Sequence, residues 1–234
     1  MHTCASAVPV AVAEPVVLVH GFLVSSRYME PLATLLAPHR TVYAPDLPGF
    51  GQSEKPPEVL DIPGMADALV AWMDVVGLAR AAFVGNSLGC QAVIDLAARF
   101  PARISRAVLV GPTPDPRFHT MLGQLKRLLI DMVRERLALI PIHIRDDLAA
   151  GPRRGWLTGR AALRDQVVRK LPLVRVPVLV VRGGNDPSVS PKWAVTVARL
   201  LPHGRLVTIP EAAHAINFSR PDALMAAIYP FLAE

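Results

Sequence analysis

Residues 81–89 read AAFVGNSLG, and this stretch decides both the expected fold and the expected chemistry. An apolar run of strand length, Ala81–Val84, leads directly into the pattern Gly-x-Ser-x-Gly, and a helical pattern follows at Leu88–Ala98. A serine between a strand and a helix in this pattern is typical of a nucleophile elbow, a strained turn that lifts the hydroxyl clear of the sheet. Gly85 and Gly89 suit this turn because they have no Cβ atom that could collide across it. The sequence therefore predicts that Ser87 is a nucleophile.

Strand-like and helix-like segments alternate along the rest of the chain. Besides the run before Ser87, segments with a strand pattern are Val16–Val19, Thr41–Ala44, Ala107–Val110, Val178–Val181 and Leu206–Ile209. Helical patterns occur at Met65–Val76 and Trp193–Leu201. Alternation of this kind indicates βαβ units. We therefore expect an α/β fold in which a mostly parallel sheet is covered by helices on both faces.

One segment interrupts this alternation. Residues 112–116 read PTPDP and cannot continue a regular element after the strand that ends at Val110. The following segment is amphipathic and predicts a single helix over His119–Leu139. Its apolar stripe contains Met121, Leu125, Leu128 and Met132. We expect a helical cap at residues 113–171 on a core formed by residues 1–112 and 172–234, with Leu125 and Leu128 roofing the substrate pocket.

A serine nucleophile needs a base and an orienting carboxylate. His214 lies in the loop after the last predicted strand, and loops at the carboxyl ends of parallel strands converge on one crevice. We therefore predict that His214 is the base. Asp186, in the turn Gly183–Pro187 after the preceding strand, is the expected acid, and Asp115 is the alternative. The chain order serine, aspartate, histidine is that of one acyl-transfer fold.

The expected oxyanion hole needs two backbone donors. Leu88 N–H comes directly after the nucleophile, and Phe22 N–H lies in the loop that leaves the first strong strand. We expect these two groups to bind the oxyanion, and the Phe22 side chain to line the substrate pocket. We interpret His20 as a residue that hydrogen-bonds within this loop. Cys90 is expected to be a small buried packing residue, with a redox-sensitive thiol as the alternative.

The composition restricts partners and location. The 234 residues are 52% hydrophobic and 19% charged, which excludes intrinsic disorder, and no apolar run reaches the roughly 18 residues of a membrane span. Cys4 and Cys90 cannot form a disulfide framework or a zinc site, and the first 13 residues lack the basic start of a signal peptide. We therefore expect a cytoplasmic protein without a bound metal.

The net charge is +6, and basic residues concentrate between Thr113 and Leu171. Acidic residues interrupt this basic run, and aromatic residues are few. Nucleic-acid-binding surfaces usually combine basic and stacking aromatic side chains, so we expect a solvated surface and no nucleic-acid partner. Attachment of the basic helix to a membrane surface, without insertion, is the alternative.

Five motifs carry a resemblance to a known superfamily. They are His20-Gly21-Phe22, residues 46–53 (DLPGFGQS), residues 85–89 (GNSLG), residues 183–187 (GGNDP) and Ala213-His214. In these motifs the sequence resembles the α/β-hydrolase superfamily, in particular its capped, esterase-like branch. The resemblance implies hydrolysis of a small-molecule carboxylic ester through an acyl-enzyme intermediate, without a cofactor. It also implies that residues 46–53 form a structural loop rather than a dinucleotide site.

The chain departs from this superfamily in three ways. Members usually have two strands before the one expected at Val16–Val19, so truncated N-terminal strands are expected here, with at most one at Val8–Ala13. The nucleophile is serine rather than aspartate, which argues against haloalkane dehalogenases and epoxide hydrolases. Ile216 stands two residues after His214, where carbon–carbon bond hydrolases with a Gly-Asn-Ser motif often have tryptophan.

Other functions could use the same residues. The sequence leaves open a carbon–carbon bond hydrolase, a thioesterase or a lactonase with the same triad. A carboxylate-bearing substrate would suit an arginine of the cap, such as Arg153, Arg154 or Arg160. A protein of a different class, one that binds a ligand and retains an idle triad, is a further alternative.

Overall fold

The structure is a computed structural model that describes residues 1–6, 13–118, 120–135 and 137–234. Four side chains within the helix at residues 121–134 also lie outside the description, namely those of Gln124, Leu125, Leu128 and Met132. The expected substrate contacts Leu125 and Leu128 are among them, so their role stays a prediction.

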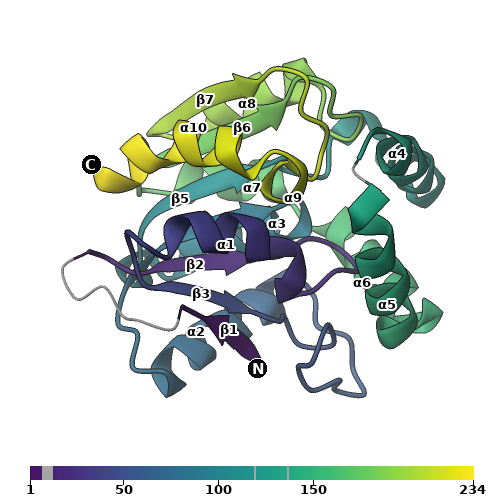
Figure 1. The fold of residues 1–234 in the computed structure, drawn as a ribbon, viewed down its shortest axis with the longest axis horizontal. Coiled ribbons are helices and arrows are strands. Elements are labelled where there is room, and N and C mark those ends of the chain that lie inside the picture. The colour runs from purple at the N-terminus through teal and green to yellow at the C-terminus, as the bar shows by residue number, and fades with distance from the viewer. Residues whose placement is uncertain (7–12, 119, 136) are drawn as a thin grey trace.

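The described residues form a seven-stranded sheet with the order β1-β3-β2-β4-β5-β6-β7. The strands are β1 (Thr3–Ala5), β2 (Val16–Val19), β3 (Val42–Pro45), β4 (Ala81–Asn86), β5 (Ile104–Val110), β6 (Val178–Gly183) and β7 (Gly204–Ile209). Only β1 is antiparallel to its neighbour β3, and all other pairs are parallel. The carboxyl ends of the parallel strands therefore lie at one edge, on the side where α4, α5 and α6 are found (Figure 1).

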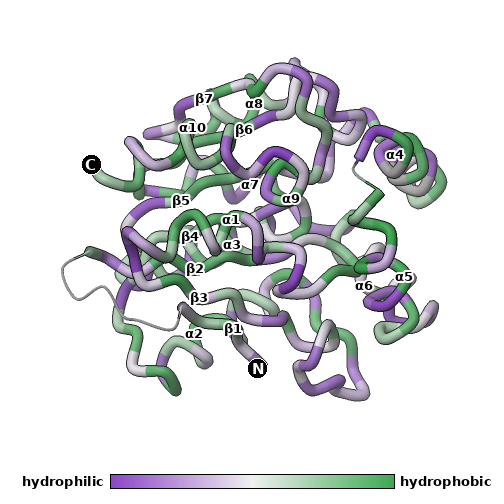
Figure 2. Tube along the Cα trace, viewed as in Figure 1, coloured by the Kyte–Doolittle hydropathy of each residue, from purple (hydrophilic) through white to green (hydrophobic). Residues whose placement is uncertain are grey.

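Two hydrophobic clusters cover the two faces of this sheet. Along β2, Val17 and Val19 belong to one cluster, whereas Val16 and Leu18 belong to the other, because successive strand residues point to opposite faces. The first cluster includes residues of α2 (Ile62–Val75), α3 (Leu88–Arg99) and α8 (Pro191–Leu200). The second includes residues of α1 (Glu30–Leu36), α10 (Pro221–Ala233) and the short α9 (Ile216–Ser219), and α1 and α10 lie on the near face in Figure 1. The central strands are correspondingly hydrophobic along most of their length (Figure 2).

The predicted α/β fold with a mostly parallel sheet is confirmed. All six predicted strands exist, and most extend one to three residues beyond the apolar run. The predicted helices begin at caps that precede their apolar positions. Asp61 accepts a hydrogen bond from Gly64 N at the start of α2, and Ser190 accepts one from Trp193 N at the start of α8. These caps explain why both helices begin two or three residues before the predicted position.

The N-terminal strand of the structure is β1, at Thr3–Ala5. The predicted strand at Val8–Ala13 falls almost entirely on residues 7–12, which lie outside the described residues. Among the described helices, none is long and apolar enough to cross a membrane.

The segment between β5 and β6 is helical, but the single helix predicted over His119–Leu139 is wrong. Helix α4 spans Met121–Arg134, and the backbone of Glu135 is extended, with φ −86° and ψ 167°. A short 3-10 turn at Leu137–Leu139 then leads into α5 (Ile140–Ala150), which is followed by α6 (Pro152–Arg164) and α7 (Val167–Lys170). Directly after this helix end, the Glu135 side chain accepts a hydrogen bond from Ala215 N.

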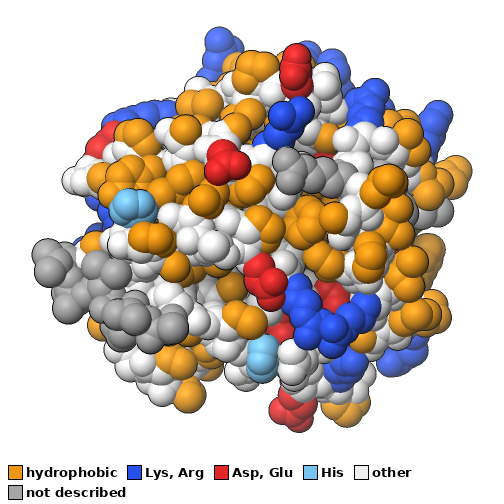
Figure 3. Space-filling view, viewed as in Figure 1, with side chains coloured by type: hydrophobic (Ala, Val, Ile, Leu, Met, Phe, Trp, Pro, Cys, Tyr) orange, Lys and Arg blue, Asp and Glu red, His pale blue; other side chains and the backbone are white. Residues whose placement is uncertain are grey.

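This segment differs from the core in what it exposes. Among its described residues, nine large apolar side chains are exposed: Leu122, Leu129, Val133, Leu137, Ile144, Leu148, Trp156, Val168 and Leu173. Hydrophobic side chains accordingly gather on the side of the molecule that α4, α5 and α6 form (Figure 3). Its last part packs differently, since Val167 and Leu171 are buried in the same cluster as α3, and Lys170 forms an ion pair with Asp95 at 2.6 Å.

Candidate active site

Ser87 lies in a strained turn between β4 and α3. Its backbone has φ 52° and ψ −114°, a conformation that non-glycine residues rarely adopt. A Cβ atom on Gly85 would lie 2.8 Å from the Gly89 carbonyl, and a Cβ atom on Gly89 would lie 2.3 Å from Val19 O on the neighbouring strand. Gly85 is therefore required for the close contact across the turn, and Gly89 is required for the close contact with β2.

His214 and Asp186 lie next to each other. His214 Nδ1 is 2.8 Å from Asp186 Oδ2, and the Asp186 side chain is fully buried. Asp186 Oδ1 accepts hydrogen bonds from Ser188 N and Val189 N, at 2.7 and 3.1 Å, which fix the carboxylate from the other side. The alternative acid, Asp115, instead accepts hydrogen bonds from the backbone of Arg117 and Ser190. The geometry therefore selects Asp186 as the partner of His214.

Gly111 makes room for this pair, and the sequence reasoning did not identify it. Gly111 follows β5 with φ +59°, and a Cβ atom there would lie 2.8 Å from His214 Cε1 and 2.9 Å from His214 Nδ1. The same atom would lie 3.3 Å from Asp186 Oδ2. The imidazole thus packs directly against the backbone of this glycine.

Ser87 and His214 border one cavity of about 540 Å³. Ser87 Oγ is 3.4 Å from Thr113 Oγ1, and no hydrogen bond joins it to His214 among the described residues. Thr113 was not singled out from the sequence, although it stands in the proline-rich exit from β5. The cavity has mainly apolar walls, which include Phe22, Met121, Leu122, Leu139, Trp156 and Leu163. Met121, from the predicted apolar stripe, is thus a wall of this cavity.

The predicted oxyanion donors are two backbone N–H groups, one directly after Ser87 and one in the loop after β2. Within the described part of the chain, neither Leu88 N nor Phe22 N donates a hydrogen bond. The loop that carries Phe22 approaches the elbow closely. A Cβ atom on Gly21 would lie 3.4 Å from Ser87 Cβ. Leu23 in the same loop has a positive φ of 56°, and such strained residues cluster at functional sites. Neither predicted oxyanion donor is thus committed to another acceptor among the described residues, and their role stays a prediction.

His20 and Asp46 stabilise the loops around this site. His20 is fully buried, and its ring bonds Gly21 O at 2.8 Å and Leu47 N at 2.9 Å. Burial lowers the pKa of His20, so the imidazole stays neutral. Asp46 accepts hydrogen bonds from Ser26 N and Gln52 N, and a Cβ atom on Gly51 would collide with its carboxylate. Residues 46–53 are therefore held as a structural loop.

Cys90 is fully buried beneath the elbow. Its Sγ donates hydrogen bonds to Gly85 O and Val110 O, at 3.2 and 3.4 Å. Burial raises the pKa of this thiol well above its usual range, so the unreactive protonated form dominates at neutral pH.

We expect Cys90→Ala to keep ester hydrolysis within about threefold of the wild type, because a small packing residue is exchanged for another. The test is kinetic, and it is paired with iodoacetamide treatment of folded Cys4→Ala protein, in which Cys90 is the remaining thiol. Loss of activity on alkylation of Cys4→Ala would contradict the assignment of Cys90 as an inert packing residue.

Burial alone would lower the pKa of His214, but nearby carboxylates outweigh this effect and raise it to about 9. These carboxylates belong to Asp186, Asp131 and Glu135; Asp131 lies in α4 and Glu135 directly follows that helix. Burial raises the pKa of Asp131 to about 7, although His214 opposes the shift. Asp131 borders the cavity and, like Glu135, was not identified from the sequence as a site residue.

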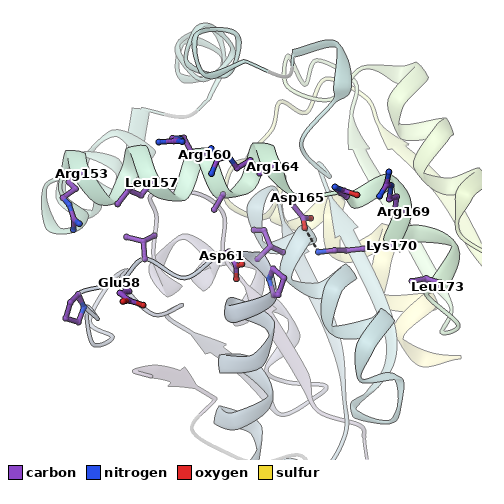
Figure 4. A pocket seen from close by; sticks show the side chains of 16 residues that line it. Glu58, Asp61, Arg153, Leu157, Arg160, Arg164, Asp165, Arg169, Lys170 and Leu173 are labelled. Carbon is purple, nitrogen blue, oxygen red and sulfur yellow. Dashed lines mark hydrogen bonds and ion pairs between the residues drawn. The ribbon is translucent and has the colours of Figure 1, made fainter.

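A second groove, of about 810 Å³, lies on the other side of α6 (Figure 4). Arg153 and Arg160 line this groove and not the cavity that contains Ser87. Arg154 donates a hydrogen bond to Pro56 O and packs against Gly49. None of the three arginines considered for a carboxylate-bearing substrate therefore lines the cavity that contains Ser87. Among the described residues, no group of three or more histidine, cysteine and acidic side chains could hold a metal ion.

The fold, the elbow and the histidine–aspartate pair define a hydrolase of the α/β class. A model of the alpha/beta hydrolase family matches residues 16–227, and the chain belongs to this family. Esterase YbfF of Escherichia coli (strain K12) is 28% identical over 237 residues, covering 93% of this chain and 92% of that protein.

Two further comparisons agree with this family. The pimeloyl-[acyl-carrier protein] methyl ester esterase of Neisseria meningitidis serogroup B / serotype 15 (strain H44/76) is 30% identical over 241 residues, covering 92% of this chain and 90% of that protein. The enol-lactonase from Burkholderia xenovorans LB400 has the same fold, with a TM-score of 0.84 at 24% identity, covering 100% of this chain and 96% of that chain.

Proposed function

We propose that this protein is a serine hydrolase that cleaves carboxylic esters with neutral, mainly apolar acyl groups of small to medium size. One observation carries the proposal: Ser87 and the Asp186-paired His214 border one cavity of about 540 Å³. No lysine or arginine is among the described residues that line this cavity. Two relatives described as esterases support the choice of an ester.

The first half of the proposed reaction acylates Ser87. Its Oγ turns from Thr113 toward His214 Nε2, gives up its proton to that nitrogen and attacks the ester carbonyl carbon. The oxyanion that forms is bound by Leu88 N–H and Phe22 N–H. Asp186 holds the imidazole by Nδ1 and stabilises its positive charge. The proton on Nε2 then passes to the leaving alcohol as the carbon–oxygen bond breaks.

The second half releases the acyl group. Water enters the place of the alcohol, and His214 Nε2 takes one of its protons while the water oxygen attacks the acyl carbon. The same two N–H groups stabilise the second oxyanion. When it collapses, Ser87 Oγ recovers a proton from His214, and the carboxylic acid leaves. The chain's own residues supply each of these steps.

The alternatives use the same serine but other substrates. Thioesters and lactones would follow the same route. Carbon–carbon bond hydrolysis of a carboxylate-bearing ketone has less support, because the nearby arginines lie outside the cavity. Turnover of p-nitrophenyl esters from acetate to palmitate, together with labelling of Ser87 by a fluorophosphonate, tests the proposal. An absence of both labelling and turnover would favour the ligand-binding protein with an idle triad and overturn it.

The cavity wall formed by Met121 offers a test of size preference. Met121 and Phe22 approach Gly159 closely, and a Cβ atom on Gly159 would lie 2.9 Å from Met121 Cε. We expect Met121→Ala to move the preference toward longer acyl chains by about fourfold in kcat/KM per added methylene, the equivalent of about 0.8 kcal/mol. Gly159→Ala narrows the same region and should favour shorter chains.

The control for this test is Leu129→Ala. Leu129 lies on the same helix, is 55% exposed and is not a wall of the cavity. The chain-length profile of this variant should match the wild type. If Met121→Ala and Leu129→Ala gave the same profile, α4 would not determine chain length.

A further inference from the structure

Helix α4 presents one row of charged residues to the loops that carry Asp186 and His214. The row, here called the charged face of α4, consists of Arg127, Asp131 and Arg134 of the helix and of Glu135, the residue that directly follows it. Spacings of four and three residues place the three helical side chains on the same side of α4. Each of the four forms a hydrogen bond to the backbone of one of the two loops.

Arg127 and Arg134 bind the loop that carries Asp186. Arg127 Nη1 donates to Pro187 O at 2.5 Å, and Arg134 Nη1 donates to Asn185 O at 2.7 Å. These carbonyl groups belong to the two residues directly before and after Asp186. The Arg127 guanidinium also stacks on the Phe118 ring, with 3.4 Å from Cζ to the ring centroid, which restricts its position.

Asp131 and Glu135 bind the loop that carries His214. Asp131 Oδ1 accepts a hydrogen bond from His214 N at 3.0 Å, and Glu135 Oε1 accepts one from Ala215 N at 2.6 Å. Both residues are buried: 6% of the Asp131 surface and 8% of the Glu135 surface are exposed. Glu135 Oε2 is buried without a hydrogen-bond partner among the described residues. Buried acids are costly unless they are hydrogen-bonded and paired with opposite charge, and here the backbone N–H groups of the loop and the imidazole of His214 supply these partners.

We propose that the charged face of α4 positions the acid and the base, so that Asp186 and His214 are aligned only while α4 is docked. This inference rests on the proposed function. Arg127, Asp131, Arg134 and Glu135 are positioning residues in this scheme, because they act through backbone bonds and charge rather than by touching the substrate. Asp131 has a second effect, since its carboxylate stabilises the protonated imidazole.

Several titratable groups face His214 among the described residues. Asp186 approaches it from the loop after β6, Asp131 from α4, and Glu135 from the position directly after α4. Tyr28 and His143 line the same cavity, and burial keeps both uncharged by raising the pKa of Tyr28 and lowering that of His143. With the pKa of His214 at about 9 and that of Asp131 at about 7, Asp131 is ionised while His214 titrates.

The test begins with Asp131→Asn, which keeps an oxygen that can accept from His214 N but removes the charge. We expect the pKa of His214 to fall by about one pH unit, because an opposite charge close to the imidazole is lost. The neutral base then forms at lower pH, so the low-pH limb of kcat/KM moves down by the same amount. Imidazole NMR titration measures the shift without any substrate.

A second variant, Asp131→Leu, removes the hydrogen bond as well. We expect kcat to fall about tenfold or more at all pH values, with KM for a short ester nearly unchanged, because the base is misaligned. Arg127→Ala tests the other loop and should lower kcat by a similar factor. Asp147→Asn removes an exposed carboxylate from α5 and should match the wild type in both readouts.

The outcomes separate the two proposals. An unchanged pKa of His214 in Asp131→Asn, together with kcat of Asp131→Leu within about twofold of the wild type, would overturn the positioning role. Loss of thermal stability alone, with an unshifted titration, would also overturn it. If the wild type hydrolysed no ester but Asp131→Asn still shifted the titration, the proposed function would fail and the effect of α4 on His214 would stand.

Discussion

Ser87→Ala is expected to lower kcat for ester hydrolysis by about four to six orders of magnitude, because the attacking oxygen is lost. The elbow should persist, since alanine meets the same backbone strain at φ 52° as serine does. We therefore expect a melting temperature near the wild-type value and a similar KM. Burst kinetics with a p-nitrophenyl ester should disappear together with steady-state turnover.

The losses within the triad should be far from additive. His214→Ala should cost about as much as Ser87→Ala, and the double variant should cost little more, because the groups act as one unit. Additive losses in the double variant would contradict a shared catalytic step.

Asp186→Asn tests the choice of acid and has a matched control. We expect a loss of about 10²- to 10⁴-fold in kcat, because an amide cannot stabilise the imidazolium as a carboxylate does. Asp115→Asn should stay near the wild type, since Asp115 bonds the backbone of Arg117 and Ser190 rather than His214. The reverse pattern in the two variants would assign the acid to Asp115.

Outside the triad itself, Gly111→Ala is expected to have the largest effect, although it adds a single methyl group. That methyl would lie 2.8 Å from His214 Cε1 and 2.9 Å from Nδ1, so the imidazole must move. A displacement of about 1 Å in a catalytic group can cost about 10²-fold in rate, and we expect a loss in kcat of that order. The new residue also has φ +59°, which costs about 1–2 kcal/mol of stability.

Gly77→Ala separates these two effects. Gly77 has a similar positive φ of +71°, but nothing lies within 4 Å of an added Cβ atom. It should therefore lose a comparable amount of stability and keep full activity. Equal activities of Gly111→Ala and Gly77→Ala would show that the imidazole does not depend on the packing seen at Gly111.

The sequence alone was sufficient for the six parallel strands and the elbow, for local reasons, but it did not indicate β1 at Thr3–Ala5. Strands buried on both faces are continuous apolar runs, so β2 could be read directly from Val16–Val19. Strand ends were less predictable, because β6 continues through Arg182 and Gly183, which pair with Thr208 and Ile209 of β7. Whether a polar residue stays in a strand depends on the neighbouring strand, which local pattern does not contain.

The sequence could rank the two candidate acids, but it could not decide between them. Asp115 and Asp186 both follow strands whose carboxyl ends lie at the same edge of the sheet. What separates them is the path of each loop, since Asp186 turns toward His214 and Asp115 turns toward Ser190 N. Loop paths depend on contacts between segments far apart in the chain. The residues next to each aspartate therefore do not specify the path of its loop.

The sequence by itself determined the α/β architecture, the strained serine and the order of the candidate triad, because each depends on neighbours along the chain. The tertiary structure decided which charges of residues 113–171 face the site. Periodicity marked α4 as amphipathic and drew attention to its apolar stripe, while Asp131 and Glu135 counted only as part of a charged surface. Their contact with His214 and Ala215 joins residues about 80 positions apart. A helical pattern identifies the charged side of a helix, but only packing determines what that side meets.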